Sequence, residues 1–340
     1  MAERIAIVGA GVSGLTCGVV LAERGYHVSI FAKETGQQTT SAAAGAVWFP
    51  YHVKPADKVI PLALETYNVL ADLAGIPASG VSMIESRQFL RSGKIEIPDW
   101  AIPLGASVIP GKVENGAARK AARWAGRTEA KRTGSEQIKS LESFKSGFSL
   151  RVPLMDTTIY LDYLAARFRE RGGKINANTY LQRLEDVDSR FDLVINCSGI
   201  GARDLVRDPD VEPHRGQVAI VPKIEGLSRV IVCDDAPLMY AIPRTNDCVF
   251  GGTNDLSDNL GADPTTTKRI VGECSRVLNI RTPRVIAERV GLRPFRTSGV
   301  RLERDRSRDG RVIIHNYGHG GAGFTLSWGC AHEVFGLATL

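Results

Sequence analysis

The sequence predicts a mixed α/β protein, in which a Rossmann-like nucleotide-binding part with a parallel sheet is interleaved with a substrate-binding part built on an antiparallel sheet. One observation is a glycine-rich turn between an apolar strand and a helix at the N-terminus. The other is a change in the sequence pattern from Gly216 onward, where short strands of alternating polarity are separated by turn residues. The chain has 340 residues, 43% of them hydrophobic, which is enough for two domains.

The N-terminal turn has the sequence GAGVSG, residues 9–14. It follows the apolar strand IAIV and precedes LTCGVVLAERG, which is typical of a helix; a second apolar strand, HVSIFA, comes next. GxGxxG indicates a dinucleotide site when it stands between a strand and a helix, as it does here. Because the turn opens a helix, the amides of Val12 and Ser13 are expected to face the phosphates.

Each glycine of the turn has a separate task. Gly9 permits the tight turn, Gly11 lets a pyrophosphate approach the backbone, and Gly14 lets the helix pack on the strand. Glu34 follows Gly14 by about 20 residues, where a carboxylate accepts hydrogen bonds from ribose hydroxyls. The neighbouring Lys33 would instead favour a phosphorylated ribose, and the motif alone does not separate FAD from NAD.

The remaining elements are predicted in chain order. A helical stretch covers 58–76, and a second helix, with Asp156 as N-cap and a glycine stop, covers 156–173. LVIN is a buried strand that runs into a glycine turn. GQVAIVP, SRVIVCD, LMYAIPR and DCVFGGT predict antiparallel strands, followed by the helix TKRIVGECSRVL and the strands VIAERVGLRPF and RVIIHNY. We expect a discontinuous nucleotide-binding domain (1–50, 149–212 and 300–340) and a discontinuous substrate-binding domain (51–148 and 213–299).

Composition excludes several classes of protein. Much of the formal charge of +6 lies in residues 111–132, which contain almost no aromatic residues; a solvated loop of unassigned role is favoured over a nucleic-acid reader. The six cysteines are scattered without a CxxC pair, which indicates a reducing compartment. With no signal peptide and no membrane-spanning run, we expect a soluble cytoplasmic protein. A peroxisomal location would require that a C-terminal SKL had been trimmed.

Nine segments, taken together, resemble the D-amino-acid oxidase family of flavoproteins. They are VGAGVSGL, TTSAAAGAVWFPY, VPLMDTTIYLDYL, INCSGIGAR, RGQV, YAIPR, GGT, GLRPFR and HNYGHGGAGFTLSWG. GLRP and HNYGHGG are specific to this family and to its close relative, D-aspartate oxidase. The resemblance implies FAD as cofactor and a D-amino acid and dioxygen as substrates, with release of the imino acid and hydrogen peroxide. It also implies hydride transfer from Cα to flavin N5.

The resemblance assigns the substrate contacts to three residues. Arg293 is expected to bind the carboxylate bidentately, Tyr240 to hold the same carboxylate, and the Gly321 carbonyl to receive the amine. From the residues alone, Arg293 could equally be a structural arginine paired with Glu288, and Tyr240 a core residue. No side chain is needed as a general base if the amine is bound neutral, so that positioning supplies most of the catalysis.

The loop that follows RVIIHNY is interpreted as the anion site of the flavin. Its glycines let backbone approach the ring, the helix that follows directs its N-terminal amides toward the same edge, and Thr325 would add a hydroxyl donor. The full set of expected cofactor contacts is Gly9, Gly11, Val12, Ser13, Gly14, Lys33, Glu34, Thr39, Thr40, Ser41, Ala44, Gly45, Tyr180, Ser198, Gly199, Gly318, Gly320, Gly321, Gly323, Phe324 and Thr325. The expected substrate pocket comprises Val47, Phe49, Tyr51, Tyr240, Asn254, Arg293 and Gly321, with Trp48 and Met239 beside it.

Several alternatives stay open. Asn254 stands where some relatives place a second tyrosine, so part of the carboxylate clamp is expected to be weaker or rearranged. The segment between Cys233 and Tyr240 leaves no room for a long mobile lid. Neutral D-amino acids are expected as substrates; a D-aspartate oxidase would need another cation, His52 or Arg244. A nucleotide-binding protein without redox activity is the alternative of another class. No metal is expected, because glycines make a helix through His315 and His319 improbable. The oligomeric state is left open.

Overall fold

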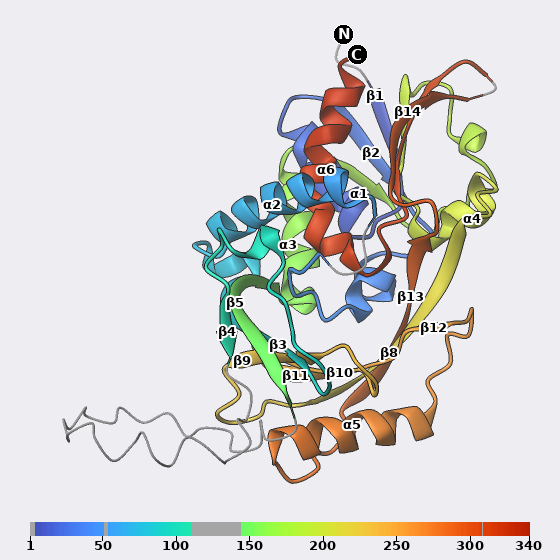
Figure 1. The fold of residues 1–340 in the computed structure, drawn as a ribbon. Coiled ribbons are helices and arrows are strands. Elements are labelled where there is room, and N and C mark those ends of the chain that lie inside the picture. The colour runs from blue at the N-terminus through green and yellow to red at the C-terminus, as the bar shows by residue number, and fades with distance from the viewer. Residues whose placement is uncertain (1–3, 51–53, 110–143, 308) are drawn as a thin grey trace, which may run out of the picture.

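The computed structural model describes residues 4–50, 54–109, 144–307 and 309–340. The expected 111–132 loop, Tyr51 and His52 lie outside these residues. Two sheets organise the rest of the chain (Figure 1). The smaller one has the strand order β14-β15-β7-β1-β2-β6, and the larger one has nine strands.

The smaller sheet is the expected Rossmann-like element. Its strands β1 (Arg4–Val8), β2 (His27–Phe31), β6 (Lys174–Asn176), β7 (Leu193–Asn196) and β15 (Val312–Tyr317) run parallel, and β14 (Arg301–Arg306) is antiparallel to β15. The central strands are apolar because helices and loops cover both faces. The strand–turn–helix–strand context of GxGxxG is thereby confirmed, with α1 (Val12–Ala22) beginning inside the motif.

The helices α3 (Thr157–Glu170) and α6 (Gly323–Ala338) pack on α1, and α2 (Ala56–Leu73) packs on α6. Asp156 caps α3 as expected, because its carboxylate accepts a hydrogen bond from the Thr158 amide at 3.1 Å. Glycines let these helices approach: a Cβ on Gly329 of α6 would stand 2.3 Å from the Leu62 carbonyl oxygen of α2. The helices, α1 and the sheet share one hydrophobic core.

The larger sheet has the order β12-β8-β11-β10-β9-β3-β5-β4, with β13 paired to β8 as a further branch. All its pairs are antiparallel except β3 with β9. Its strands are β3 (Val81–Leu90), β4 (Ser107–Ile109), β5 (Ser146–Met155), β8 (Val211–Pro222), β9 (Arg229–Cys233), β10 (Met239–Pro243), β11 (Asp247–Gly251), β12 (Asp255–Leu256) and β13 (Ala287–Arg296). The strand β5 extends across the domain boundary expected at 149.

The helix α5 (Pro264–Leu278) covers the outer face of the larger sheet (Figure 1). Its apolar side buries Ile270, Val271 and Cys274 against alternate residues of the strands, among them Met239 and Phe250. Residues of opposite parity on the same strands therefore face the other way, toward the smaller sheet. This alternation decides which side chains reach the cavity between the sheets. The short helix α4 (Ala202–Leu205) follows β7.

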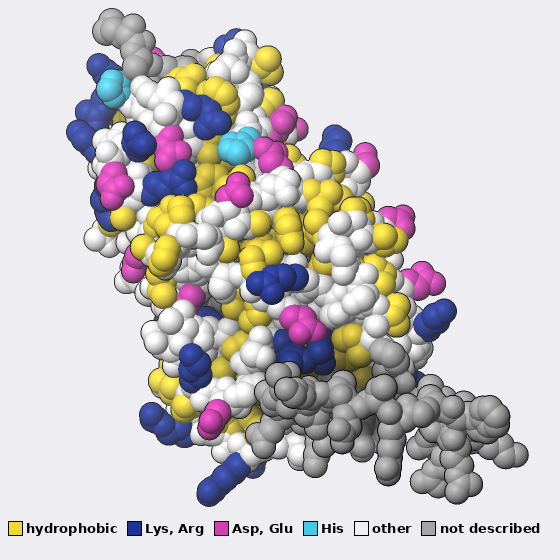
Figure 2. All heavy atoms as spheres, turned by 90° about the vertical axis from the view of Figure 1, so that its left-hand side faces the viewer, with side chains coloured by type: hydrophobic (Ala, Val, Ile, Leu, Met, Phe, Trp, Pro, Cys, Tyr) yellow, Lys and Arg dark blue, Asp and Glu magenta, His cyan; other side chains and the backbone are white. Residues whose placement is uncertain are grey.

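The structure shows how charged side chains are distributed on one face and where the cysteines lie. On the face shown in Figure 2, positive and negative side chains are interspersed among hydrophobic ones. None of the helices in the described ranges is long and apolar enough to cross a bilayer. All six cysteines are free and buried.

Candidate active site

One cavity of about 720 Å³ opens between the two sheets and joins a nucleotide end to a substrate end. At the nucleotide end it is lined by the GxGxxG turn, the residues after β2 and the loop 39–47. At the substrate end it is lined by β10, β13 and residues of β3, β8 and β9. The start of α6 and the preceding turn, Gly320–Ala322, contribute to the same cavity. Segments far apart in the sequence thus surround a single elongated site.

Two of the GxGxxG glycines, Gly9 and Gly14, occupy positions where no side chain fits. A Cβ on Gly9, whose φ is +110°, would stand 2.3 Å from the Cys197 carbonyl oxygen. A Cβ on Gly14 would stand 1.9 Å from the Gly9 carbonyl oxygen, so Gly14 serves the packing of α1 and does not line the cavity. Gly11, the N-cap of α1, has no side chain of its own to cap the helix, and the start of α1 lines the cavity edge.

Ser41 extends this N-terminal edge. Its Oγ accepts a hydrogen bond from the Val12 amide at 3.0 Å, which leaves the hydroxyl hydrogen to donate to another group. Ser198 also lines the cavity, and its Oγ donates to Asn196 Oδ1 at 2.6 Å. Both serines line the nucleotide end, where a phosphate or a ribose would need hydroxyl partners.

Most of the expected cofactor residues line the cavity. The set comprises Gly9, Gly11, Val12, Ser13, Lys33, Glu34, Thr39, Thr40, Ser41, Ala44, Gly45, Tyr180, Ser198, Gly199, Gly320, Gly321, Gly323 and Phe324. Gly318 lies outside the lining: its φ is +83°, and a Cβ there would stand 2.8 Å from the Arg296 side chain. The expectation that the Thr325 hydroxyl donates to the flavin is corrected. This hydroxyl donates to the Phe49 carbonyl at 3.0 Å and accepts from the Phe49 amide at 3.1 Å. That hydroxyl is therefore committed to the backbone and does not face the cavity.

The two histidines of HNYGH are buried and neutral near pH 7. Burial lowers the pKa of His319 to about 4, and burial together with Arg301 lowers that of His315 to about 4. His319 lines the cavity, and its Nε2 is 3.0 Å from Asn316 Oδ1. Within the described residues no group of histidine, cysteine and acidic side chains is arranged to hold a metal.

A row of residues crosses the larger sheet at the substrate end. Gln88 pairs with Val232, Val232 with Tyr240, Tyr240 with Gly251, and Gly251 with Val218. All but Gly251 line the cavity, so the register of five strands brings residues from four of them into one wall. Tyr240 is the polar group at its centre. Burial raises the pKa of its hydroxyl, against the opposing effect of Arg293, and the hydroxyl stays a neutral donor.

Three glycines make room for the two polar side chains expected to bind the substrate. A Cβ on Gly251 would stand 2.0 Å from the Tyr240 ring, and one on Gly252 would stand 2.8 Å from the Tyr240 hydroxyl. A Cβ on Gly216 would stand 2.5 Å from Arg293 Nη2. The absence of side chains at these strand positions allows Tyr240 and Arg293 to lie flat on the sheet, facing the cavity.

Arg293 is half-buried and has no carboxylate within ion-pairing distance among the residues that the structure describes. Its Nη1 donates to the Thr253 carbonyl at 2.9 Å and lies 3.3 Å from Asn254 Oδ1. The alternative partner, Glu288, is engaged by the Thr267 hydroxyl. Asn254 does not line the cavity and instead supports Arg293 from behind. A fixed guanidinium of this kind is suited to a carboxylate ligand.

The turn that contains Gly321 lies beside the strand that carries Arg293. An isolated antiparallel bridge joins Phe295 at the end of β13 to His319, and the turn Gly320–Ala322 follows at once. The bridge places this turn beside β13, and Arg293 and Gly321 both line the cavity. A cation and a backbone turn thus stand where one ligand could meet both.

Of the other residues expected at the substrate end, some line the cavity and others do not. Val47 and Phe49 line the cavity. Met239 and Trp48 do not: Met239 packs toward α5 because Tyr240 faces the cavity, and Trp48 is wholly buried with its Nε1 donating to the Ala63 carbonyl. Arg244 is unavailable as a second cation, because its buried guanidinium pairs with Asp247 at 2.7 Å.

The sequence interpretation missed other residues of this lining, including Gln88, Asp234, Leu238 and Ile242. Ile242 could have been found, because it alternates with Tyr240 on one strand. Gln88 could not, since it enters through the pairing of β3 with β9, a contact between distant segments.

The residues fit FAD. The nucleotide end presents glycines, helix amides and hydroxyls to a diphosphate, and the cavity continues without interruption to Tyr240 and Arg293. The start of α6, which also lines the cavity, has no side-chain cap on its first amides. Two helix N-termini therefore face one elongated site, as a dinucleotide with a reactive ring at one end requires.

Comparisons with known proteins agree with this geometry. Residues 4–337 match the family described as FAD dependent oxidoreductase (DAO). A D-amino-acid oxidase of Rubrobacter xylanophilus is 37% identical over 98% of this chain and 95% of its own, and the human D-aspartate oxidase is 31% identical over 99% and 94%. Among solved structures, glycine oxidase from Geobacillus kaustophilus aligns with a TM-score of 0.78 at 18% identity, over 99% of this chain and 95% of its own, which shows the shared fold.

Proposed function

The chain belongs to the DAO family of FAD-dependent oxidoreductases and uses FAD as its cofactor, and from this premise we propose that it oxidises neutral D-amino acids. The products are the imino acid, which hydrolyses to the 2-oxo acid and ammonia, and hydrogen peroxide. The observation that carries the proposal is Arg293, a cation without an acidic partner among the described residues, fixed beside Tyr240 in a largely apolar cavity. The homology to amino-acid oxidases supports the same reaction.

The substrate carboxylate binds the Arg293 guanidinium, and the Tyr240 hydroxyl donates to the same group. Tyr240 serves as a neutral donor, because burial raises its pKa. Asn254 and the Thr253 carbonyl hold the far side of the guanidinium and prevent it from turning away. The Gly321 backbone at the same end receives the amine. When the carboxylate and the amine are both held, the orientation of the Cα–H bond is fixed.

Bound FAD supplies a two-electron acceptor for the Cα hydrogen and passes the electrons to dioxygen. The protein groups do not need to remove a proton from Cα, since the hydrogen leaves with its electron pair. Among the described residues that line the cavity, Lys33 belongs to the nucleotide end and His319 bonds Asn316, and neither is proposed as a base. Positioning is accordingly the main contribution of the chain to the rate.

Preference for neutral over acidic side chains follows from the rest of the lining. Val47, Val218, Val232, Leu238 and Ile242 are apolar, and Asp234 is negative. Among the described lysines and arginines, Arg293 alone lines this end. A second substrate carboxylate would meet no lysine or arginine of its own among the described residues of this end, an arrangement that disfavours binding.

The test is peroxide release from a panel of D- and L-amino acids by the purified holoenzyme. We expect release with D-alanine and D-methionine, a much lower kcat/KM with D-aspartate, and none with the L-enantiomers. Higher efficiency on D-aspartate than on the neutral amino acids would make D-aspartate oxidation the function. Release with L-amino acids alone would reject the proposed stereochemistry.

A further inference from the structure

The loop between β9 and β10, residues 234–238, forms part of the rim of the cavity and is here called the rim loop. Met239 pairs with Cys233, so that the loop closes a hairpin, and its residues Asp234 and Leu238 line the cavity. The strand β3 runs parallel to β9, with Phe89 opposite Cys233. Both strands therefore end at the same edge of the sheet, and Arg91, just past β3, comes beside Asp235, just past β9.

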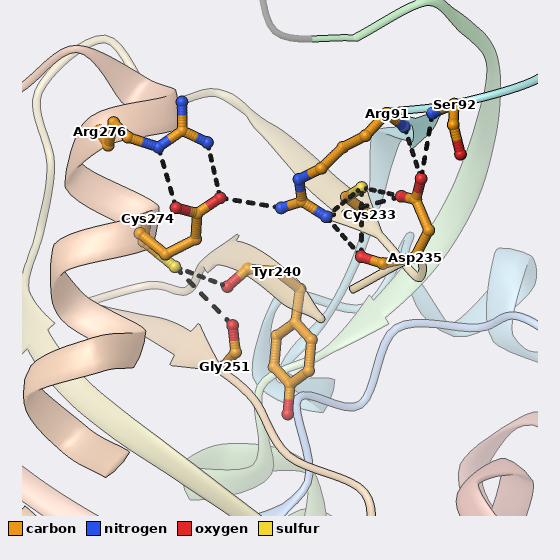
Figure 3. Close-up of polar contacts among 9 residues, drawn as sticks. Arg91, Ser92, Cys233, Asp235, Tyr240, Gly251, Cys274 and Arg276 are labelled. Atoms are coloured by element: carbon orange, nitrogen blue, oxygen red, sulfur yellow. Dashed lines mark hydrogen bonds and ion pairs between the residues drawn. The ribbon is translucent and has the colours of Figure 1, made fainter. Parts of the chain in front are cut away.

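Arg91 and Asp235 are joined by several contacts, drawn in Figure 3. Asp235 Oδ2 accepts hydrogen bonds from the Arg91 amide at 2.7 Å and from the Ser92 amide at 3.2 Å. Arg91 Nη1 donates to the Asp235 backbone carbonyl and lies 2.9 Å from Cys233 Sγ. The thiol of Cys233 in turn donates to Asp235 Oδ1 at 2.6 Å. The side chain and the backbone of Asp235 are both held.

The other end of Arg91 is tied to α5. Its Nη2 donates to Glu273 Oε1 at 2.8 Å, and Arg276 binds both oxygens of the same carboxylate (Figure 3). The next residue of α5, Cys274, places its Sγ 3.4 Å from the Tyr240 backbone carbonyl. One helix thus supports both the rim loop, through Arg91, and the strand that carries Tyr240.

This network is largely buried and lies apart from the cavity. The side chains of Arg91, Asp235 and Glu273 are 17%, 26% and 13% exposed. Cys233, at the end of β9, packs in the cluster that α5 covers. None of Arg91, Asp235, Cys233 and Glu273 lines the cavity. Any effect of these residues on substrate must therefore pass through the position of the rim loop.

We propose that Arg91 is a positioning residue, which clamps the rim loop against β3 and α5 and so keeps the substrate end of the cavity in its binding-competent shape. The proposal rests on the proposed function, because the substrate is taken to be an amino acid bound by Arg293 and Tyr240. A loop joined at both its backbone and its carboxylate is held in one place. If the clamp is removed, only a fraction of molecules presents the intact rim, and the apparent affinity falls by that fraction.

The first test is hydrogen exchange of the holoenzyme over the peptide 233–240. Replacing Arg91→Met keeps an unbranched apolar stem and removes every donor of the guanidinium. We expect exchange in this peptide to rise by about tenfold or more, since local opening controls it, with no change in the GxGxxG segment. The matched control is Arg276→Met, which removes an arginine from the same Glu273 carboxylate and leaves the rim loop contacts in place; its peptide 233–240 should exchange as in the wild type.

Kinetics provide the second readout. In Arg91→Met, KM for the best amino-acid substrate should rise by about tenfold, while kcat stays within about twofold, because saturating substrate selects the intact rim. Arg91→Lys keeps one donor toward Asp235 and should recover part of the affinity. If Arg91→Met does not yield folded, FAD-loaded protein, Asp235→Ala is measured instead, because it removes the carboxylate contacts of the clamp and leaves Glu273 paired with Arg91 and Arg276.

Unchanged exchange and an unchanged KM in the folded variant would overturn the proposal. An equal loss of kcat and of FAD content, without added exchange in 233–240, would also overturn it, since that pattern is general destabilisation. The exchange measurement needs no substrate, so its result does not depend on the proposed function. A wild type that released no peroxide with any amino acid would reject the function and leave the loop measurement valid.

Discussion

The Arg293 guanidinium lies so close to Gly216 that a Cβ on residue 216 would stand 2.5 Å from Nη2 and 2.6 Å from Cζ. Real Cβ atoms do not approach other atoms this closely, so Gly216→Ala must displace the guanidinium. We expect KM for the amino acid to rise at least tenfold, a loss of about 1.4 kcal/mol in binding, with FAD binding unchanged. Steady-state kinetics and the flavin spectrum of the same preparation measure the two effects.

Gly272→Ala is the matched control for Gly216→Ala. Gly272 lies in α5, where an added Cβ would meet no atom within 4 Å. This variant should keep the wild-type KM. If Gly216→Ala behaved like the control, Arg293 would be able to move without loss, and its fixed position would not matter for binding.

Arg293→Leu tests the carboxylate contact itself. Loss of a charge-assisted, bidentate contact costs about 3 to 5 kcal/mol, and we expect kcat/KM to fall by more than about a hundredfold. The control is Arg289→Leu on the same strand, since Arg289 bonds Gln37 and does not line the cavity. A fall of less than tenfold in Arg293→Leu would show that the carboxylate binds elsewhere.

The parts of the site that could be predicted from the sequence are those fixed by local rules. The GxGxxG motif predicts its own backbone conformation, because Gly9 needs a positive φ and Gly14 has no room for a Cβ. Asp156 caps its helix through the next residues in the chain. The alternation of side chains along a strand also predicts that Met239 and Tyr240 face opposite sides of the sheet. Met239 was nevertheless expected near the substrate.

The parts that could not be predicted depend on register between distant segments. Gln88 reaches the wall with Tyr240 through the pairing of β3 with β9 and of β9 with β10, which no local pattern fixes. The clamp between Arg91 and Asp235 joins residues 144 positions apart. The hydroxyl of Thr325 was expected to face the flavin; it bonds Phe49, 276 positions away, and only the tertiary structure reveals that competing partner.

The protein should lose stability in mild acid because of its buried histidines. The pKa values of His315 and His319 are lowered from 6.5 to about 4. Unfolded histidine takes up a proton first, so this stability is present above pH 6.5 and is lost as the pH falls toward 4. The free energy of unfolding should decrease by about 1.4 kcal/mol per pH unit for each histidine.

Unfolding of the holoenzyme by urea, followed at several pH values by flavin fluorescence, measures this slope. His319→Gln should remove about one histidine's share of it without removing the share of His315. The control is His332→Gln, a change at a more accessible histidine that pairs with Glu65. Equal slopes in the wild type and in His319→Gln would contradict the assignment of His319 as a buried neutral group.

The last prediction concerns the start of α6. Gly323 is the first residue of this helix and lines the cavity, as Gly321 does. Its φ of −55° is close to the value that proline fixes, and an added Cβ would be 3.7 Å from Val12 Cγ1, an ordinary contact. Proline is well tolerated at the first position of a helix. Gly323→Pro removes one amide donor, and it also shifts the start of the helix, because a following proline disfavours the ψ of 21° at Ala322. Gly323→Ala adds a Cβ while keeping the amide.

If the amides at the start of α6 stabilise negative charge on the bound flavin, Gly323→Pro should weaken sulfite binding. Sulfite adds to flavin N5 and leaves a negative charge on the N1–C2 edge, so its affinity reports on anion stabilisation without turnover. Removing one donor should raise the dissociation constant by about tenfold or more, since a hydrogen bond to a charged group contributes about 1.5 to 3 kcal/mol. Gly323→Ala should bind sulfite like the wild type, and titration of the flavin absorbance measures all three proteins. If Gly323→Pro, loaded with FAD, bound sulfite as tightly as Gly323→Ala, the Gly323 amide would not contribute, and the charge would have to be stabilised by other groups of the cavity.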